Sequence, residues 1–148
     1  MTYKQYDLTA SLQRYLVGNS GIRTDIIFDG YTFPSERPLI TLEQMQNNHE
    51  YNVKRKEAVE VIYRWQIGLL ASNAVERMQT QETISDLLTF GEVPYFDFEK
   101  SADNPAGFFN LTLNDVMPMP SEDVTDHSRK HTVYFDVELA TFKRKRRG

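Results

Sequence analysis

The fold is decided by residues 57–88, EAVEVIYRWQIGLLASNAVERMQTQETISDLL, in which two hydrophobic periodicities follow each other. Up to Ile67, large apolar and polar residues alternate, which is typical of a strand with one buried face because successive side chains point to opposite sides. Gly68 then relaxes the backbone, and apolar residues recur at helical spacing further on. The sequence therefore predicts a long strand that leads directly into a helix. The apolar face of that strand comprises Val59, Val61, Tyr63, Trp65 and Ile67.

The predicted helix covers about four turns over residues 73–88 and ends near Gly91. Ser72 or Asn73 is expected to accept hydrogen bonds from the free amides of its first turn. Its apolar residues are expected in the core, because residues of these types are usually buried. They are Ala71, Val75, Met78, Ile84, Leu87 and Leu88.

Shorter patterns predict the other elements. An amphipathic helix is expected over residues 2–17, with Thr2 as its cap, Gly18 as its end, and an apolar stripe of Tyr6, Leu8, Leu12, Tyr15 and Leu16. Strands are expected over residues 25–28, 37–45, 93–98, 108–116 and 132–142. Residues 47–55 are polar and form either a loop or the tip where two strands turn. The order α-β-β-β-α-β-β-β predicts an α+β fold, a mostly antiparallel sheet flanked by two helices.

Length and composition narrow the possible classes. With 148 residues, 40% of them hydrophobic, the chain suits one domain over residues 1–148, followed from 143 to 148 by a basic tail. The 17 basic and 21 acidic residues give a net charge of -4, which argues against a protein that coats nucleic acid. Since there is no cysteine, disulfides, thiolate catalysis and cysteine-based zinc sites are excluded. No signal peptide and no run of about 20 apolar residues is found, so no membrane partner is expected.

Two segments are predicted to contact a partner. About fifteen residues, 117–131, separate the last two predicted strands, and a connection of that length is usually functional or extends its strands into a projecting hairpin. Five consecutive basic residues, 143–147, either form a solvated tail or attach to an acidic surface or DNA. The candidate interface residues are Asn47, Asn48, Met117, Met119, Glu122, Asp123, Asp126, His127, Arg129, Lys143, Arg144, Lys145 and Arg146.

Catalytic and metal sites have little support in the sequence. His127 and His131, with Asp123 and Asp126 nearby, have metal-ligand chemistry, but no helical periodicity gives their spacing a geometric meaning. A second acidic group, at positions 97, 99 and 103, lacks the spacing of a calcium loop. A third group, at positions 136, 138 and 143, is a nuclease-like alternative whose acidic-to-lysine spacing is too long. We therefore expect no enzyme activity, no metal and no cofactor.

Four phrases carry a resemblance to a known family. They are RPLITLEQMQ, VIYRWQIGLLASN followed by a helix, GFFNLTLNDVMPMPSED and HTVYFDVELATFKR. Together they resemble the tail terminator or tail completion proteins of long-tailed bacteriophages, also described as head-to-tail joining proteins. The resemblance rests on strand-like phrases and element order over most of the chain.

The resemblance implies a structural virion protein without enzymatic activity or cofactor. Such a protein is assembled in the host cytoplasm and forms a ring, typically a hexamer, that caps the tail tube and docks on the head connector. Its partners would be other copies of itself, the tail tube protein and the connector, with DNA or the tape-measure protein possible contacts of the basic tail. The alternatives are a connector-side neck or head completion protein, a phage-encoded metal-dependent nuclease, and a small adaptor.

Overall fold

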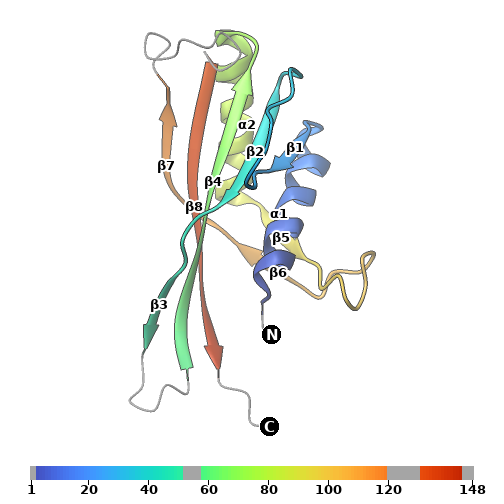
Figure 1. Ribbon diagram of the computed structural model, residues 1–148, viewed down its shortest axis with the longest axis vertical. Helices are drawn as coiled ribbons and strands as arrows, with labels where there is room; N and C mark the ends of the chain where they lie inside the picture. Colours follow the sequence, from blue (N-terminus) through green and yellow to red (C-terminus); the bar gives the residue numbers. More distant parts are fainter. Residues whose placement is uncertain (1–2, 52–57, 120–130, 145–148) are drawn as a thin grey trace.

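The computed structural model describes residues 3–51, 58–119 and 131–144, which fold into two helices and eight strands (Figure 1). The elements follow each other as α1 (Gln5–Ser20), β1 (Thr24–Ile26), β2 (Leu39–Gln44), β3 (Asn48–Tyr51), β4 (Ala58–Ala71), α2 (Ala74–Phe90), β5 (Glu92–Tyr95), β6 (Gly107–Asn110), β7 (Thr112–Pro118) and β8 (His131–Arg144). The predicted α+β class and the order of its predicted elements are confirmed. No helix in the described ranges is long and apolar enough to span a membrane.

The long predicted strand is β4, the centre of the main sheet. β4 pairs antiparallel with β8 along its whole length, from Ala58 opposite Arg144 to Ala71 opposite His131. On its other side β4 pairs with β2 and β3, and the sheet continues to β1 beyond β2 and to β7 beyond β8. All of these pairings are antiparallel except that of β1 with β2, which is parallel.

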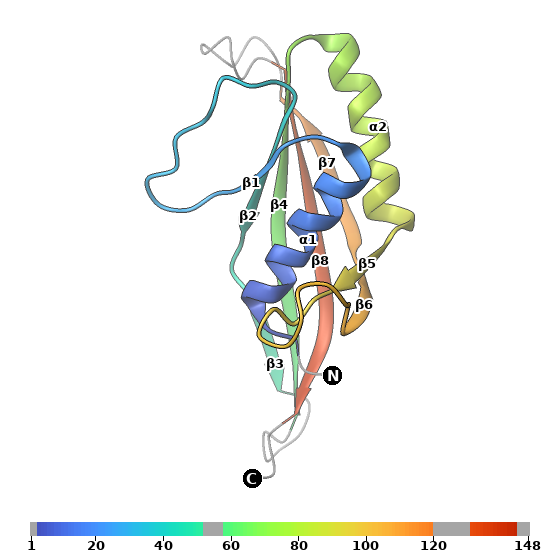
Figure 2. The same ribbon diagram turned by 90° about the vertical axis from the view of Figure 1, so that its right-hand side faces the viewer.

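Both helices pack on one face of this sheet (Figure 2). From Val61 to Ile67 in β4 and from Val133 to Leu139 in β8, the predicted apolar faces point toward the helices and are buried, with Trp65 1% exposed and Phe135 0% exposed. Trp65 also donates its indole N–H to Thr9 Oγ1 of α1 over 3.0 Å. The Thr9 hydroxyl in turn donates to Gln44 Oε1 of β2 over 2.8 Å, so one buried relay joins α1 to two strands.

The N-terminal helix ends later than predicted. Gly18 lies inside α1, and the helix stops at Gly21, whose φ of 70° is the left-handed conformation that favours glycine at this position. Tyr6 is exposed, whereas the other predicted apolar residues of this helix are buried. Thr2, the predicted cap, lies outside the described residues.

The second helix has the predicted cap but a smaller buried face. Asn73 accepts a hydrogen bond from the Glu76 amide over 2.8 Å, and the Glu76 carboxylate accepts one from the Ser72 amide in return. The prediction that Val75 and Met78 are core residues is wrong, because they are 59% and 55% exposed. The helix packs on the sheet through its C-terminal half, where its two buried residues, Ile84 and Leu88, lie one turn apart.

One predicted strand is divided in the structure, and one polar segment contains a short strand. Residues 108–116 form parts of β6 and β7, which are separated at the buried Leu111 and belong to different sheets, β6 pairing with β5 and β7 with β8. In the polar segment 47–55, residues 48–51 form β3, as expected if two strands turn there. β3 and the adjoining ends of β4 and β8 extend beyond the helices (Figure 1).

A close contact between the two helices gives a first prediction. Tyr15 of α1 donates its hydroxyl to the Leu87 carbonyl over 2.9 Å, and a Cβ at Gly91 would lie 1.6 Å from that hydroxyl oxygen and 2.4 Å from the same carbonyl. We expect Gly91→Ala to lower the free energy of unfolding by about 1 to 3 kcal/mol, because the added methyl group would force the Tyr15 side chain and the nearby backbone to move. Urea unfolding followed by circular dichroism measures the change.

Gly18→Ala is the matched control. A Cβ at Gly18 meets nothing within 4 Å, and the position is helical. The same substitution there is expected to raise the free energy of unfolding by about 0.5 to 1 kcal/mol, because alanine loses less backbone entropy in a helix. Equal effects of the two substitutions would contradict the close contact at Gly91.

The buried relay gives a second prediction. Thr9→Val keeps the shape of the side chain but leaves the Trp65 indole N–H without its acceptor, which is expected to cost about 1 to 3 kcal/mol in the free energy of unfolding. Thr9→Ser keeps the hydroxyl and is expected to cost clearly less. The two variants are compared by urea unfolding, and equal costs would show that the hydroxyl is unimportant.

Candidate interface on the outer face of the sheet

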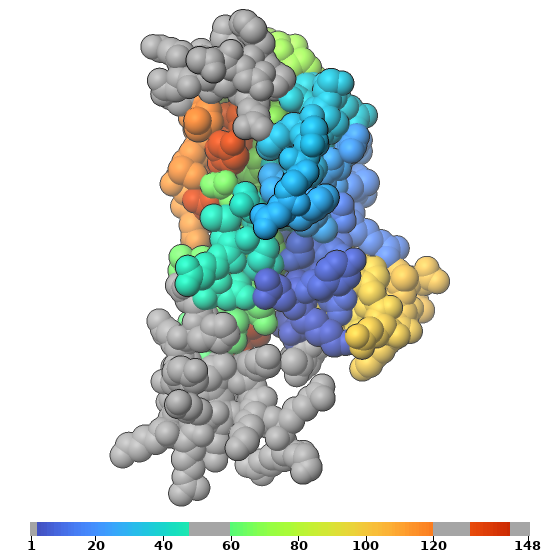
Figure 3. All heavy atoms as spheres, in the orientation of Figure 1, coloured from blue at the N-terminus to red at the C-terminus, as the bar shows by residue number. Residues whose placement is uncertain are grey.

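The helices leave the opposite face of the main sheet uncovered (Figure 2), and we call this face the outer face. Figure 3 shows it, with β7 in orange and β8 in red at the surface beside the blue loop that leads from β1 to β2. Strand alternation and register place on it Thr41, Glu43, Arg64, Gln66, Gly68, Asp115, Met117, Tyr134, Asp136 and Glu138. Toward the end of β8 the same face carries Phe142, which is 62% exposed.

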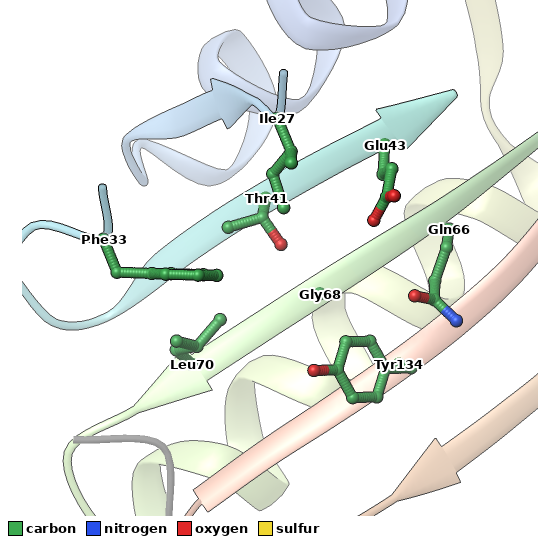
Figure 4. Close-up of a pocket in the computed structure, with 8 residues that line it drawn as sticks. All are labelled: Ile27, Phe33, Thr41, Glu43, Gln66, Gly68, Leu70 and Tyr134. Carbon is green, nitrogen blue, oxygen red and sulfur yellow. The ribbon is translucent and has the colours of Figure 1, made fainter. Parts of the chain in front are cut away.

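A hollow of about 100 Å³ lies in the outer face where the loop meets the sheet. It is lined by Ile27, Phe33, Thr41, Glu43, Gln66, Gly68, Leu70 and Tyr134. Figure 4 shows the polar side chains of Glu43 and Gln66 at one end and the apolar Phe33 and Leu70 at the other. Sites for small molecules usually measure roughly 300 Å³ or more, so this hollow suits the end of a single side chain.

Gly68 forms the floor of the hollow. It lies opposite Thr41 on one neighbouring strand and Tyr134 on the other. A Cβ at this position would lie 2.5 Å from Thr41 Oγ1 and 3.4 Å from the Tyr134 ring, so only glycine leaves the space open. The strand β4 runs through Gly68 and continues to Ala71.

The loop that forms the wall of the hollow is tied to β1. Tyr31 donates its hydroxyl to Asp25 Oδ2 over 2.8 Å, and its ring packs edge-on against Phe33 with centroids 5.0 Å apart. Burial and the hydrogen bond to Asp25 raise the pKa of Tyr31 to about 12. Arg23 lies 2.9 Å from Asp25 and 3.4 Å from Glu36, at the two ends of the loop. These contacts hold the loop so that Phe33 forms part of the wall of the hollow and does not fill it.

Acidic side chains form a row across the outer face. Glu43 is opposite Gln66, Gln66 is opposite Asp136, and Asp136 is opposite Asp115. In the described part of the chain these three carboxylates have no cationic partner within 4.0 Å, whereas the nearby Glu138 lies 3.8 Å from Arg64. Like charges directly opposite each other destabilise a sheet, and here the register of β7 shifts by one residue between Leu113 and Asp115. The row therefore gives the outer face a negative character.

The predicted interface residues that the structure describes lie in different parts of the fold. Asn47 donates to Gln5 Oε1 of α1 over 3.0 Å and accepts from Gln44. Met117 lies in β7, and the Met119 amide donates to the Thr132 carbonyl, so both belong to the base of the β7–β8 hairpin. Asn48 begins β3, while Lys143 and Arg144 end β8 at the opposite end from that hairpin. Glu122, Asp123, Asp126, His127, Arg129, Lys145 and Arg146 lie outside the described residues, and the interface role of all these positions stays a prediction.

The weaker chemical alternatives gain no support from the structure. Among the described residues, no group of three His, Asp or Glu side chains is placed to hold a metal ion. Asp97 and Glu99 share the ammonium group of Lys4, at 3.2 and 3.1 Å. Of the histidine pair, His131 begins β8 and His127 lies outside the described ranges. The nuclease-like carboxylates Asp136 and Glu138 lie on the outer face, with Glu138 beside Arg64.

Sequence reasoning missed the hollow. Its walls come from three strands and a loop that are distant in the sequence, and none of its residues forms a motif. One signal was available, because a glycine inside a strand pattern often marks a close approach of neighbouring groups.

Comparison with known proteins gives a similarity of fold to solved structures. No protein-family model and no curated protein matches the sequence. Among solved structures, the fold is similar to that of the sheath/tube terminator of an extracellular contractile injection system, PVC, in the extended state, with a TM-score of 0.50 and 8% sequence identity. The match covers 98% of this chain and 58% of the terminator chain, so this chain spans just over half of its relative's length. The chain therefore shares the fold of a tail-terminating structural protein.

Proposed function

We propose that the protein is a structural subunit that terminates a tail tube, assembling with copies of itself into a ring on the end of the tube. The observation that carries this proposal is the fold match over 98% of the chain to a sheath/tube terminator. It agrees with the resemblance to phage tail terminators that the sequence phrases suggested. Two lines of reasoning, one from sequence phrases and one from fold, thus favour the same role.

The surfaces of the molecule suit an assembly protein. The helices cover one face of the sheet, and the opposite face carries a hollow, a row of carboxylates and the exposed Phe142. β3 and the adjoining ends of β4 and β8 extend beyond the helices (Figure 1). Residues placed in a projection contribute more to contacts with neighbours than to the stability of the single subunit.

The finer parts of the proposal follow from the sequence resemblance. They are a bacteriophage virion as the location, a hexameric ring, and a second surface that docks on the head connector. Residues 117–131 and residues 47–55 are assigned to contacts with neighbouring subunits or with the tube protein. In this role the protein acts through shape and repeated interfaces, and it needs neither a cofactor nor a metal.

The mass of the purified protein in solution tests this proposal. We expect light scattering to give the mass of a ring, either for the protein alone or after addition of the tube protein of the same particle. Added to growing tubes, the protein is expected to stop their elongation, which electron microscopy of tube lengths would show. A strict monomer that leaves tube growth unchanged would contradict the terminator role and favour a connector-side neck protein or an adaptor.

A further inference from the structure

We propose that the basic segment, residues 143–147, of one copy binds the hollow in the outer face of the next copy and makes the head-to-tail contact of the ring. This inference rests on the proposed ring and names the two surfaces that would form its subunit contact. The sequence left the partner of the basic segment open.

The lining of the hollow matches the side chain of a lysine or arginine. The carboxylate of Glu43 and the amide oxygen of Gln66 lie on neighbouring strands at one end and can accept hydrogen bonds from a cationic group. Phe33, Leu70 and the ring of Tyr134 offer apolar contact to the methylene stem behind that group (Figure 4). An arginine fits best, because its planar guanidinium can pair with the carboxylate through two bonds and stack on a ring.

The charges of the two surfaces are complementary. The hollow lies at one end of the acidic row formed by Glu43, Asp136 and Asp115, and the segment 143–147 consists of five consecutive basic residues. Attraction between opposite surface potentials favours this encounter. The same carboxylates would repel nucleic acid phosphates, so the outer face is a poor surface for DNA.

The contact must join two copies, because a chain cannot reach its own hollow. The acidic row that contains Glu43 crosses β8 at Asp136. Asp136 lies eight residues before Arg144, so the two residues are about 26 Å apart along the extended strand. From Arg144 the three residues to Arg147 span at most about 11 Å even when fully extended. The donor segment and the acceptor hollow thus lie far apart along the same strand.

This separation lets the contact repeat from copy to copy. Each copy presents one basic segment and one hollow on different parts of its surface, so it can give its segment to one neighbour and receive a segment from another, which is a heterologous contact. Repeated heterologous contacts give a ring when the rotation between neighbours closes, and an open filament when it does not. Two copies that exchange their basic segments reciprocally would form a two-fold dimer instead, and the mass in solution distinguishes this dimer from a ring.

A peptide-binding experiment tests the contact directly. The receptor is the full chain with residues 143–147 all replaced by Ser, which leaves its hollows free of basic segments from other copies. The probe is a fluorescently labelled peptide with the sequence of residues 140–148, ATFKRKRRG, followed by fluorescence anisotropy. We expect binding that Glu43→Gln in the receptor weakens about tenfold or more, the effect of losing a charge-assisted hydrogen bond.

Two matched controls accompany this measurement. Glu82→Gln removes the same charge at an exposed position of α2, remote from the outer face, and is expected to change the affinity less than about twofold. A peptide with Ser at the five basic positions is expected not to bind. Equal weakening by Glu43→Gln and Glu82→Gln, or no binding of the basic peptide at all, would overturn the proposal.

The solution masses of the wild-type chain and of the three receptor variants show whether the subunit contact or the terminator role is wrong. If the wild-type chain forms rings, the Ser variant and Glu43→Gln are both expected to lower the ring mass toward that of the monomer, while Glu82→Gln keeps it. Rings that persist in both variants would overturn the contact between segment and hollow but leave the terminator role intact. A wild-type chain that never forms rings contradicts the proposed function, and this result is obtained before any variant is made.

Discussion

The antiparallel pairing of β4 with β8 is the constraint on which the rest of the structure depends. Each strand has 14 residues, and the two are matched along their whole length. Since the register of a sheet fixes which side chains share a face, this one pairing separates a buried face under the helices from an outer face. It also places the hollow near one end of β8 and the basic residues at the other end.

The helices stabilise only part of this long ribbon. α1 is attached to it through the buried relay of Trp65, Thr9 and Gln44, and α2 through the short stripe of Ile84 and Leu88. Beyond the helices, β3 and the ends of β4 and β8 have strand pairing but little helical cover. The molecule thus combines a well-packed body with a projection that extends beyond the helices (Figure 1).

Much of the fold could be predicted because its signals are local. The alternation from Val61 to Ile67 and from Val133 to Leu139 identified the buried faces correctly, and Asn73 identified the start of α2. The exposure of Val75 and Met78 could not be predicted, because it depends on where α2 lies on the sheet. The same holds for the hollow, since Phe33, Glu43 and Tyr134 become neighbours only through strand register and the course of a loop. The local periodicity of the sequence carries no information on strand register or on the course of a loop.

The shifted register of β7 affects how the sheet can grow at that edge. β7 is the last strand on its side, and it combines the bulge between Leu113 and Asp115, an exposed carboxylate at Asp115, and Pro118, which has no amide hydrogen to donate. Bulges, charges and prolines are the features by which edge strands avoid pairing with another chain. This edge is therefore a poor template for a further strand, and copies of the protein are kept from stacking into an endless sheet. In the proposed role at the end of a tube, such an edge would limit assembly to the intended contacts.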